Sequence, residues 1–147
     1  MIRIGMGFDI HPLEAGYPLV LGGVKIDYSH GLVGHSDADV LTHAVIDSLL
    51  GAGALGDIGD YFSSDDPEYR EISSLLLLQK TAAIIREANL RVVNIDATIV
   101  AENPRLSPFR DAMRKNIADA LSIEINDVNV KATTAEGLDS IGNGQGI

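Results

Sequence analysis

The stretch GHSDADVLTHAVIDSLLGAGALGDIG, residues 34–59, predicts a long helix with a polar start and a glycine-rich end. Ser36 is a good N-cap for a helix from about Asp37 to Leu50, and Asp39 adds a carboxylate near the positive end of the helix dipole. Part of the SDAD motif, residues 36–39, is therefore predicted to cap the helix. Helical spacing gives the segment one apolar stripe that we expect to face the core. The stripe consists of Val40, Leu41, Ala44, Val45 and Leu49.

A candidate metal site joins this helix to the upstream stretch GMGFDIHP, residues 5–12. In a strand, Asp9 and His11 project from the same face, and His43 can reach them from the helix. Three such ligands leave one position of a zinc ion open, which is typical of a catalytic site. We expect Asp47, one helical turn after His43, to orient the far nitrogen of its ring. From spacing alone, however, an Asp-x-His pair is more often solvated than metal-bound.

The rest of the chain alternates between strands and helices, without internal repeats. Alternation of apolar and polar residues indicates strands, and a 3.6-residue period indicates helices. The glycines of the tail GLDSIGNGQGI argue against a helix there. Besides the helix above, the predicted elements are a strand at 2–8, a hairpin at 19–26 turning at Gly22-Gly23, a helix at 72–88, a strand at 91–101, a helix at 107–121 and a strand at 127–134. We expect one α/β domain over residues 1–147.

Composition narrows the possible functions. The chain of 147 residues is 46% hydrophobic and has no cysteine, so any metal must be held by histidine and carboxylate. The net charge of −10 repels nucleic acid and anionic membranes, and we expect neither as a partner. The charged residues near the start argue against a signal peptide, and no apolar run reaches membrane-spanning length. We therefore expect a soluble cytoplasmic protein.

Two other motifs do not lead to a function. Gly5-Met6-Gly7 lacks the third glycine and the helix of a dinucleotide-binding fingerprint. Ser36 beside His35 is not flanked by the sequence of a nucleophile elbow, and its hydroxyl already has a predicted capping role.

Five segments together resemble the 2-C-methyl-D-erythritol 2,4-cyclodiphosphate synthase family over nearly the whole chain. They are GFDIHP, LGGVKI, GLVGHSDADVLTHAVIDSLLGAGALGDIGDYF, the PRLSP loop and VNVKATTAEGL. Three motifs are specific for this family when they occur in this order, namely GHSDAD with its later histidine, GDIG and KATTAE. The resemblance implies a lyase of non-mevalonate isoprenoid synthesis that cyclises 4-diphosphocytidyl-2-C-methyl-D-erythritol 2-phosphate and releases CMP.

The resemblance also implies roles for individual residues. Asp9, His11 and His43 match the zinc ligands, one zinc per subunit, and Glu136 matches a residue that helps to hold Mg²⁺ or Mn²⁺ between the phosphates. His35 and Thr134 match residues that stabilise the transition state. The methylerythritol pocket is matched by Ser36, Asp57, Ile58 and Gly59, and the cytidine pocket by Ala101, Glu102, Asn103, Pro104, Arg105, Leu106, Ser107, Ala132, Thr133 and Thr134. Further substrate-binding residues are expected at Ile10, Phe62, Ser63, Ser64, Asp65, Asp66, Ala135, Ser140 and Asn143.

The chain departs from the family pattern at four of these positions. Arg105 replaces a common Lys, Ser64 an Asp, Ser140 a Phe and Asn143 an Arg, and the chain stops at Ile147 before the usual final strand. The Arg is linked in the family to an anion or isoprenoid pocket on a threefold axis, so the Asn143 position predicts poor binding there.

The family fold implies a mixed sheet with helices on one face, and a homotrimer with active sites between subunits. Two alternatives remain open at this point. One is a binding protein of the same fold that has lost turnover. The other is a zinc hydrolase with Asp47 or Asp57 as general base.

Overall fold

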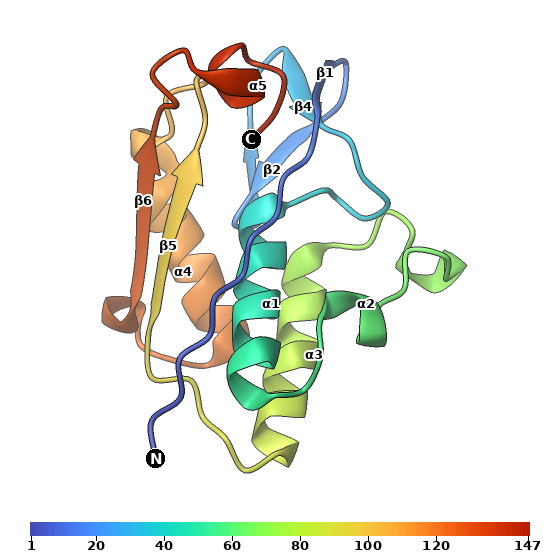
Figure 1. Ribbon diagram of the computed structural model, residues 1–147, viewed down its shortest axis with the longest axis vertical. Helices are drawn as coiled ribbons and strands as arrows, with labels where there is room; N and C mark the ends of the chain where they lie inside the picture. The colour runs from blue at the N-terminus through green and yellow to red at the C-terminus, as the bar shows by residue number, and fades with distance from the viewer.

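Three long helices form one layer of the fold, which the computed structural model describes for residues 1–147 (Figure 1). Helix α1, Val40–Gly53, packs against α3, Ser74–Glu87, and α3 packs against α4, Arg110–Leu121. Helix α4 also packs on strand β6, Val128–Thr133. The α/β architecture predicted from the sequence is therefore confirmed, and the predicted helices are found within a few residues of their expected bounds.

The strands pair in three separate ladders of two strands each. Strand β5, Ile95–Val100, runs parallel to β6. The other two ladders are antiparallel and join β1, Leu13–Ala15, to β4, His30–Leu32, and β2, Leu19–Leu21, to β3, Val24–Ile26. The β2–β3 pair is the hairpin expected at Gly22-Gly23. The single mixed sheet expected from the family resemblance is not formed within this chain, because no hydrogen-bonded strand links the ladders.

The N-terminal segment, expected as a strand at 2–8, belongs to no ladder and runs as an extended chain across α1 (Figure 1). Two glycines permit this approach. A Cβ atom on Gly5 would lie 1.8 Å from the carbonyl oxygen of Ser48, and one on Gly7 would lie 1.9 Å from that of Ala44. The backbone is therefore packed directly on the helix.

Helix α1 begins three residues later than Ser36 predicts, because Asp39 is its N-cap. The Asp39 carboxylate accepts hydrogen bonds from the Thr42 backbone at 3.0 Å and the Thr42 hydroxyl at 2.8 Å. It also accepts from the backbone N–H groups of Gly22 at 2.9 Å and Gly23 at 2.7 Å. This buried side chain thus joins the hairpin turn to the start of α1.

Short elements complete the chain. Helix α2, Ile58–Tyr61, follows α1, and 3₁₀ turns occupy Pro67–Tyr69, Ser107–Phe109 and Ile125–Asp127. The tail, expected to be free of helix, forms a four-residue helix α5, Asp139–Gly142. Its glycines do not prevent this turn, because Gly142 and Gly144 lie at its end and beyond it.

The hydrophobic core lies between the helices and the ladders and contains 27 buried apolar residues. Four residues of the predicted stripe of α1 are buried, and Ala44 is partly buried. None of the helices combines the length and apolar character needed to cross a membrane.

Candidate metal centre

Asp9, His11 and His43 come together where the N-terminal segment passes the first turn of α1. The Asp9 Oδ2 atom lies 3.1 Å from His11 Nε2 and 2.9 Å from His43 Nδ1. One nitrogen or oxygen atom from each residue lies within 4.8 Å of the other two. All three side chains are partly exposed. One carboxylate oxygen and two imidazole nitrogens form a donor set that suits zinc, so these residues fit a metal ion.

The opposite side of each ligand group is held by a hydrogen bond. The Asp9 Oδ1 atom accepts from the Ile10 backbone N–H at 2.9 Å, which leaves Oδ2 facing the histidines. His11 Nδ1 lies 2.8 Å from the Val33 carbonyl oxygen, to which it donates when it carries the proton. His43 Nε2 lies 2.8 Å from the Ser74 hydroxyl and 3.0 Å from the Ser36 hydroxyl. These partners fix which ring nitrogen faces the centre.

The backbone around His11 is fixed as well. His11 N–H donates to the Ile147 carbonyl at 3.2 Å, and the Ile147 N–H donates to the His11 carbonyl at 3.3 Å. The buried Ile147 side chain belongs to the core. The last residues of the chain therefore help to position a predicted metal ligand.

The three groups shift one another's ionisation. Burial alone raises the pKa of Asp9, but hydrogen bonds from His11 and His43 and the charges of the two rings overcome this and lower it well below its usual range. The hydrogen bond to Asp9 raises the pKa of His11 despite partial burial. A metal ion at this cluster therefore competes with a proton on His11.

Asp47 does not perform the role that the sequence predicts. Its Oδ1 atom accepts from the Ile58 backbone N–H at 2.8 Å, and its place next to His43 Nε2 is taken by Ser74. One helical turn does bring residues 43 and 47 to neighbouring positions, but the Asp47 side chain turns toward the chain that follows α1. Asp47 thus positions the start of α2 instead of a metal ligand.

His35 and Ser36 stand beside the triad in the chain that leads into α1. His35 Nε2 is 3.2 Å from the Asp66 carbonyl oxygen. His35 also lines a cavity of about 470 Å³ together with Tyr17, Val33, Gly34, Arg70 and Glu71. The Arg70 guanidinium gives this cavity N–H groups that can donate to phosphate oxygens, and His35, whose Nε2–H is directed at Asp66, can donate through Nδ1 only when the ring carries both hydrogens.

Other residues expected to bind the substrate lie at α2 and in the loop after it. The Asp57 side chain caps α2 and accepts from the backbone N–H groups of Gly59 and Asp60. Phe62 packs edge-on against Tyr69, and Ser63, Ser64 and Asp65 are exposed in the loop. The Oδ1 atom of Asp57 is therefore used in capping within this chain.

The residues expected around cytidine gather at the carboxyl ends of β5 and β6. Ala101 N–H donates to the Thr133 carbonyl at 2.9 Å, and Glu102 accepts from the Ala135 N–H at 3.2 Å. The Thr134 hydroxyl donates to Glu136 at 3.3 Å. Asn103, Pro104, Arg105, Leu106 and Ser107 complete this loop, and Arg105 donates to the Ser107 hydroxyl at 2.9 Å.

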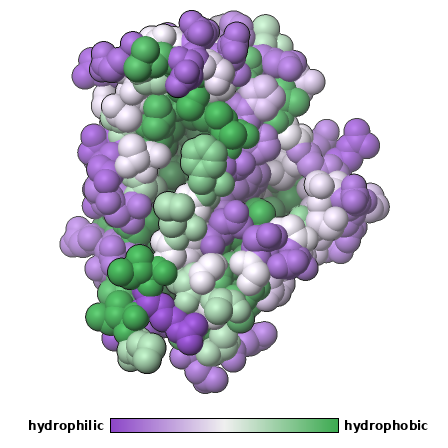
Figure 2. Space-filling view, in the orientation of Figure 1, coloured by the Kyte–Doolittle hydropathy of each residue, from purple (hydrophilic) through white to green (hydrophobic).

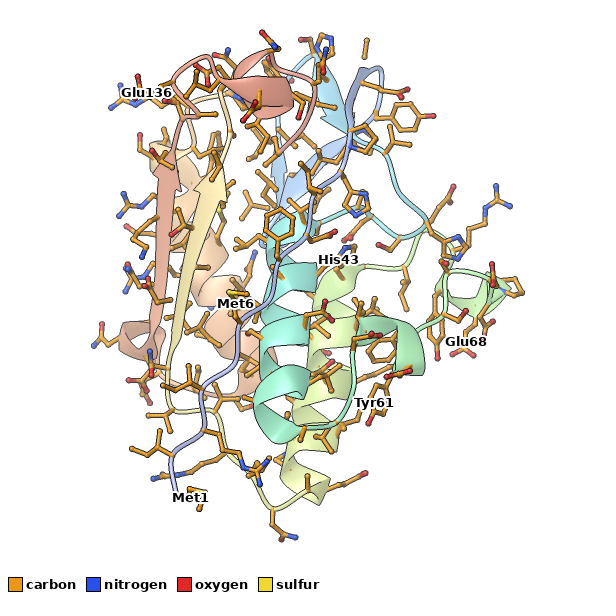
Figure 3. The ribbon with its side chains drawn as sticks, in the orientation of Figure 1. Met1, Met6, His43, Tyr61, Glu68 and Glu136 are labelled. Carbon is orange, nitrogen blue, oxygen red and sulfur yellow. The ribbon has the colours of Figure 1, made fainter.

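The residues expected at the metal centre and those expected at the carboxyl ends of β5 and β6 do not meet within one chain. Glu136 lies near the end of β6, well apart from His43 at the metal centre (Figure 3). Glu136 is likewise outside the cluster of potential metal ligands. Ser140 and Asn143 are exposed on and beside α5.

Sequence reasoning missed Asp37 and Ser74. Asp37 was assigned to the start of α1, and Ser74 is a single serine at the start of α3 without any motif around it. Only the folded chain brings them together next to His43.

An α/β fold with a carboxylate and two imidazoles at one partly exposed cluster defines a candidate metalloenzyme. Comparison with known proteins specifies the class further. The profile of the YgbB family matches residues 2–147, and the chain belongs to this family.

Curated relatives share most of the length of the chain. A 2-C-methyl-D-erythritol 2,4-cyclodiphosphate synthase of Lachnospira eligens is 56% identical over 99% of this chain and 80% of the relative. The protein of the same name from Syntrophomonas wolfei is also 56% identical, over 99% of this chain and 93% of the relative. The family resemblance noted in the sequence is thereby confirmed.

Solved structures share the fold. The bifunctional IspDF of Campylobacter jejuni matches with a TM-score of 0.95 and 41% identity, over 99% of this chain and 40% of that longer chain. IspF of Plasmodium falciparum, in a complex with CDP, matches with a TM-score of 0.85 and 35% identity, over 98% of this chain and 88% of that one.

Proposed function

We propose that this protein cyclises 4-diphosphocytidyl-2-C-methyl-D-erythritol 2-phosphate to 2-C-methyl-D-erythritol 2,4-cyclodiphosphate with release of CMP, as a lyase of isoprenoid synthesis. In this reaction an oxygen of the 2-phosphate bonds to the β-phosphorus, the bond from that phosphorus to CMP breaks, and no water is consumed. The single observation that carries the proposal is the cluster of Asp9, His11 and His43 in a chain that shares 56% identity with named synthases.

Asp9, His11 and His43 are the residues that would hold a zinc ion, with Asp9 Oδ2, His11 Nε2 and His43 Nδ1 as donors. When bound, such an ion supplies Lewis-acid neutralisation of phosphate charge. Glu136 is proposed to help hold Mg²⁺ or Mn²⁺ with the diphosphate, since carboxylate oxygens suit these hard cations.

The chain itself must position two phosphoryl groups that repel each other. The protein carries a net charge of −10, so groups that donate to phosphate must offset the overall repulsion locally. Arg70 offers such N–H groups in the cavity beside the metal centre, and His35, which lines the same cavity, is proposed to stabilise the transition state. His35 is tied to the Asp66 carbonyl, which orients its ring. Thr134 is proposed to donate to a phosphate oxygen in the transition state.

The separation of the two predicted halves of the site supports a homotrimer in which neighbours complete each active site. The metal centre lies beside α1, while Thr134 and Glu136 lie past the end of β6 (Figure 3). A second copy of the chain can bring its β6 end to the metal centre of the first, which one copy alone does not do. A cyclic assembly permits this arrangement at every site.

The N-terminal segment offers an apolar surface for such an assembly. Ile2, Ile4, Met6 and Phe8 are 87%, 92%, 88% and 74% exposed. Apolar side chains follow the path of this segment across the visible face (Figure 2). A row of exposed apolar side chains of this length favours an interface. Sedimentation at several protein concentrations tests the trimer.

Phosphorus NMR of the substrate with the protein, zinc and magnesium tests the proposed reaction. The proposal expects cyclic diphosphate and CMP in equal amounts. Linear hydrolysis products would instead indicate a zinc hydrolase, and unchanged substrate a binding protein of this fold. The cytoplasmic location expected from the sequence stays a prediction.

A further inference from the structure

Asp37, Ser74 and His43 form a continuous chain of hydrogen bonds behind the metal centre. The Ser74 hydroxyl lies 2.8 Å from His43 Nε2, on the side of the ring that faces away from Asp9. The same hydroxyl donates to Asp37 Oδ1, and the Ser74 backbone N–H donates to Asp37 Oδ2 at 2.9 Å. Ser74 is fully buried. Asp37 therefore accepts hydrogen bonds from both donor groups of Ser74, the backbone N–H and the hydroxyl.

The direction of these hydrogen bonds follows from the groups involved. A carboxylate only accepts, and a serine hydroxyl has one hydrogen to donate. Because Asp37 takes that hydrogen, the Ser74 oxygen is left to accept from His43 Nε2–H. When a metal ion replaces the hydrogen bond of 2.9 Å between His43 Nδ1 and Asp9, a hydrogen on Nε2 leaves the lone pair of Nδ1 free for that ion.

We propose that Asp37 and Ser74 are positioning residues that hold His43 in the tautomer and orientation required for a metal ion at the Asp9–His11–His43 cluster. This inference rests on the metal binding that the proposed function assigns to the cluster, and not on the cyclisation itself. It assigns to Ser74 the role that the sequence had predicted for Asp47.

The surroundings keep this chain of hydrogen bonds rigid. The backbone of residues 35–37 is joined to that of residues 71–72, since Glu71 N–H donates to the His35 carbonyl at 2.9 Å and Asp37 N–H donates to the Ile72 carbonyl at 3.1 Å. Ser73, the N-cap residue of α3, makes no side-chain capping bond. Asp37 supplies an acceptor for α3 in its place.

The neighbouring Ser36 lacks such a fixed direction. Its hydroxyl lies 3.0 Å from His43 Nε2 and accepts from the Ala38 N–H at 3.3 Å, but no carboxylate takes its hydrogen. It can therefore donate to the ring or accept from it. Ser74 is the residue whose hydrogen-bond direction selects the tautomer.

Zinc affinity in a double-mutant cycle tests the proposal. Ser74→Ala removes the acceptor, and we expect its zinc dissociation constant, measured by chelator competition, to rise by about 10 to 100-fold. Asp37→Asn keeps an oxygen that can accept from the Ser74 N–H, but its amide can donate to the Ser74 oxygen and turn the hydroxyl toward His43. We expect a comparable loss. In the double variant the two effects should not multiply, because Asp37 acts through Ser74.

Thr81→Val is the matched control. Thr81 is also fully buried on α3, and its hydroxyl donates to the Leu77 carbonyl at 2.9 Å, away from the site. A loss of zinc affinity in this control equal to that of Ser74→Ala would overturn the proposal, since it would assign the effect to helix α3 in general. Dissociation constants unchanged in Ser74→Ala, or effects that multiply in the double variant, would also overturn it.

A measurement on the unaltered protein makes the test independent of how the variants fold. In the zinc-loaded protein the ¹⁵N–¹H spectrum should contain a His43 Nε2–H resonance that exchanges slowly and lies close to Ser74 protons. A His43 ring with its hydrogen on Nδ1 would overturn the proposal. If the protein shows this resonance but does not turn the substrate over, the proposed cyclisation is contradicted, whereas the positioning role of Ser74 is supported.

Discussion

The Oδ1 atom of Asp47 accepts a hydrogen bond from the backbone N–H of Ile58 at 2.8 Å. It thereby ties α1 to the first residue of α2 across a glycine-containing turn. Ile58 and Gly59 belong to the expected methylerythritol pocket. Asp47 therefore helps to position this part of the pocket without contacting the metal centre.

Replacement of Asp47 by Ala should lower the free energy of unfolding by about 1 kcal/mol, because the Ile58 N–H loses its partner. The zinc dissociation constant should stay within about twofold of the parent value, since Ser74 and not Asp47 contacts His43. Chemical denaturation and chelator competition measure the two quantities. A tenfold loss of zinc affinity at unchanged stability would return Asp47 to the role predicted from the sequence.

His11→Ala or His43→Ala should abolish stoichiometric zinc binding and turnover, because each removes one of only three protein donors. The fold should persist, since both side chains are partly exposed and outside the hydrophobic core. Metal analysis and circular dichroism check both points. His30→Ala is the control, because His30 lies on β4 and contacts Ser29 instead of the cluster. Equal zinc content in a ligand variant and the parent would refute the assignment.

Zinc affinity and metal-free stability should respond to pH in opposite directions. The pKa of His11 is raised above its ordinary 6.5 by Asp9, and a metal needs the neutral ring. Affinity should therefore increase as pH rises from below 6.5 through the raised value. The His11–Asp9 interaction stabilises the metal-free protein fully below 6.5 and is lost as pH rises through the folded-state pKa. Titrations and unfolding at several pH values test this, and a zinc affinity independent of pH would contradict it.

Asp39→Ala should be among the most destabilising single changes in the hairpin and α1. Burial raises the pKa of the Asp39 carboxyl, and hydrogen bonds from Thr42, Gly23 and Gly22 oppose that rise. Without the carboxylate these donors lose their acceptor, so we expect a loss of roughly 2 to 4 kcal/mol in unfolding free energy. Urea denaturation measures it, with the nearby exposed Asp27→Ala as control. Similar stability in the two variants would refute this role of Asp39.

Local pattern was sufficient to predict α1, α3, α4 and the β2–β3 hairpin, because apolar periodicity is a property of short segments. The three side chains of the metal cluster were only a candidate from their spacing, and the family resemblance was needed to assign them. Contacts between distant segments were not predictable in this way. Asp39 and not Ser36 is the N-cap, because the Asp39 carboxylate also accepts hydrogen bonds from the N–H groups of Gly22 and Gly23 in the hairpin turn. Ser74 reaches His43 only because α3 packs on α1. The alternating residues of the N-terminal segment predicted a strand, but no neighbouring strand pairs with it in this chain.

Asn143 is the C-cap residue of α5, and its side chain is exposed. An amide cannot form the charged, bidentate contact with phosphate that a guanidinium forms. In the proposed trimer we therefore expect isoprenoid diphosphates to bind poorly at the threefold axis. Asn143→Arg should create or strengthen binding of geranyl diphosphate in calorimetry, whereas Asn94→Arg, an equal change of charge at another exposed asparagine, should not. Tight binding by the parent protein would show that Asn143 does not limit this interaction.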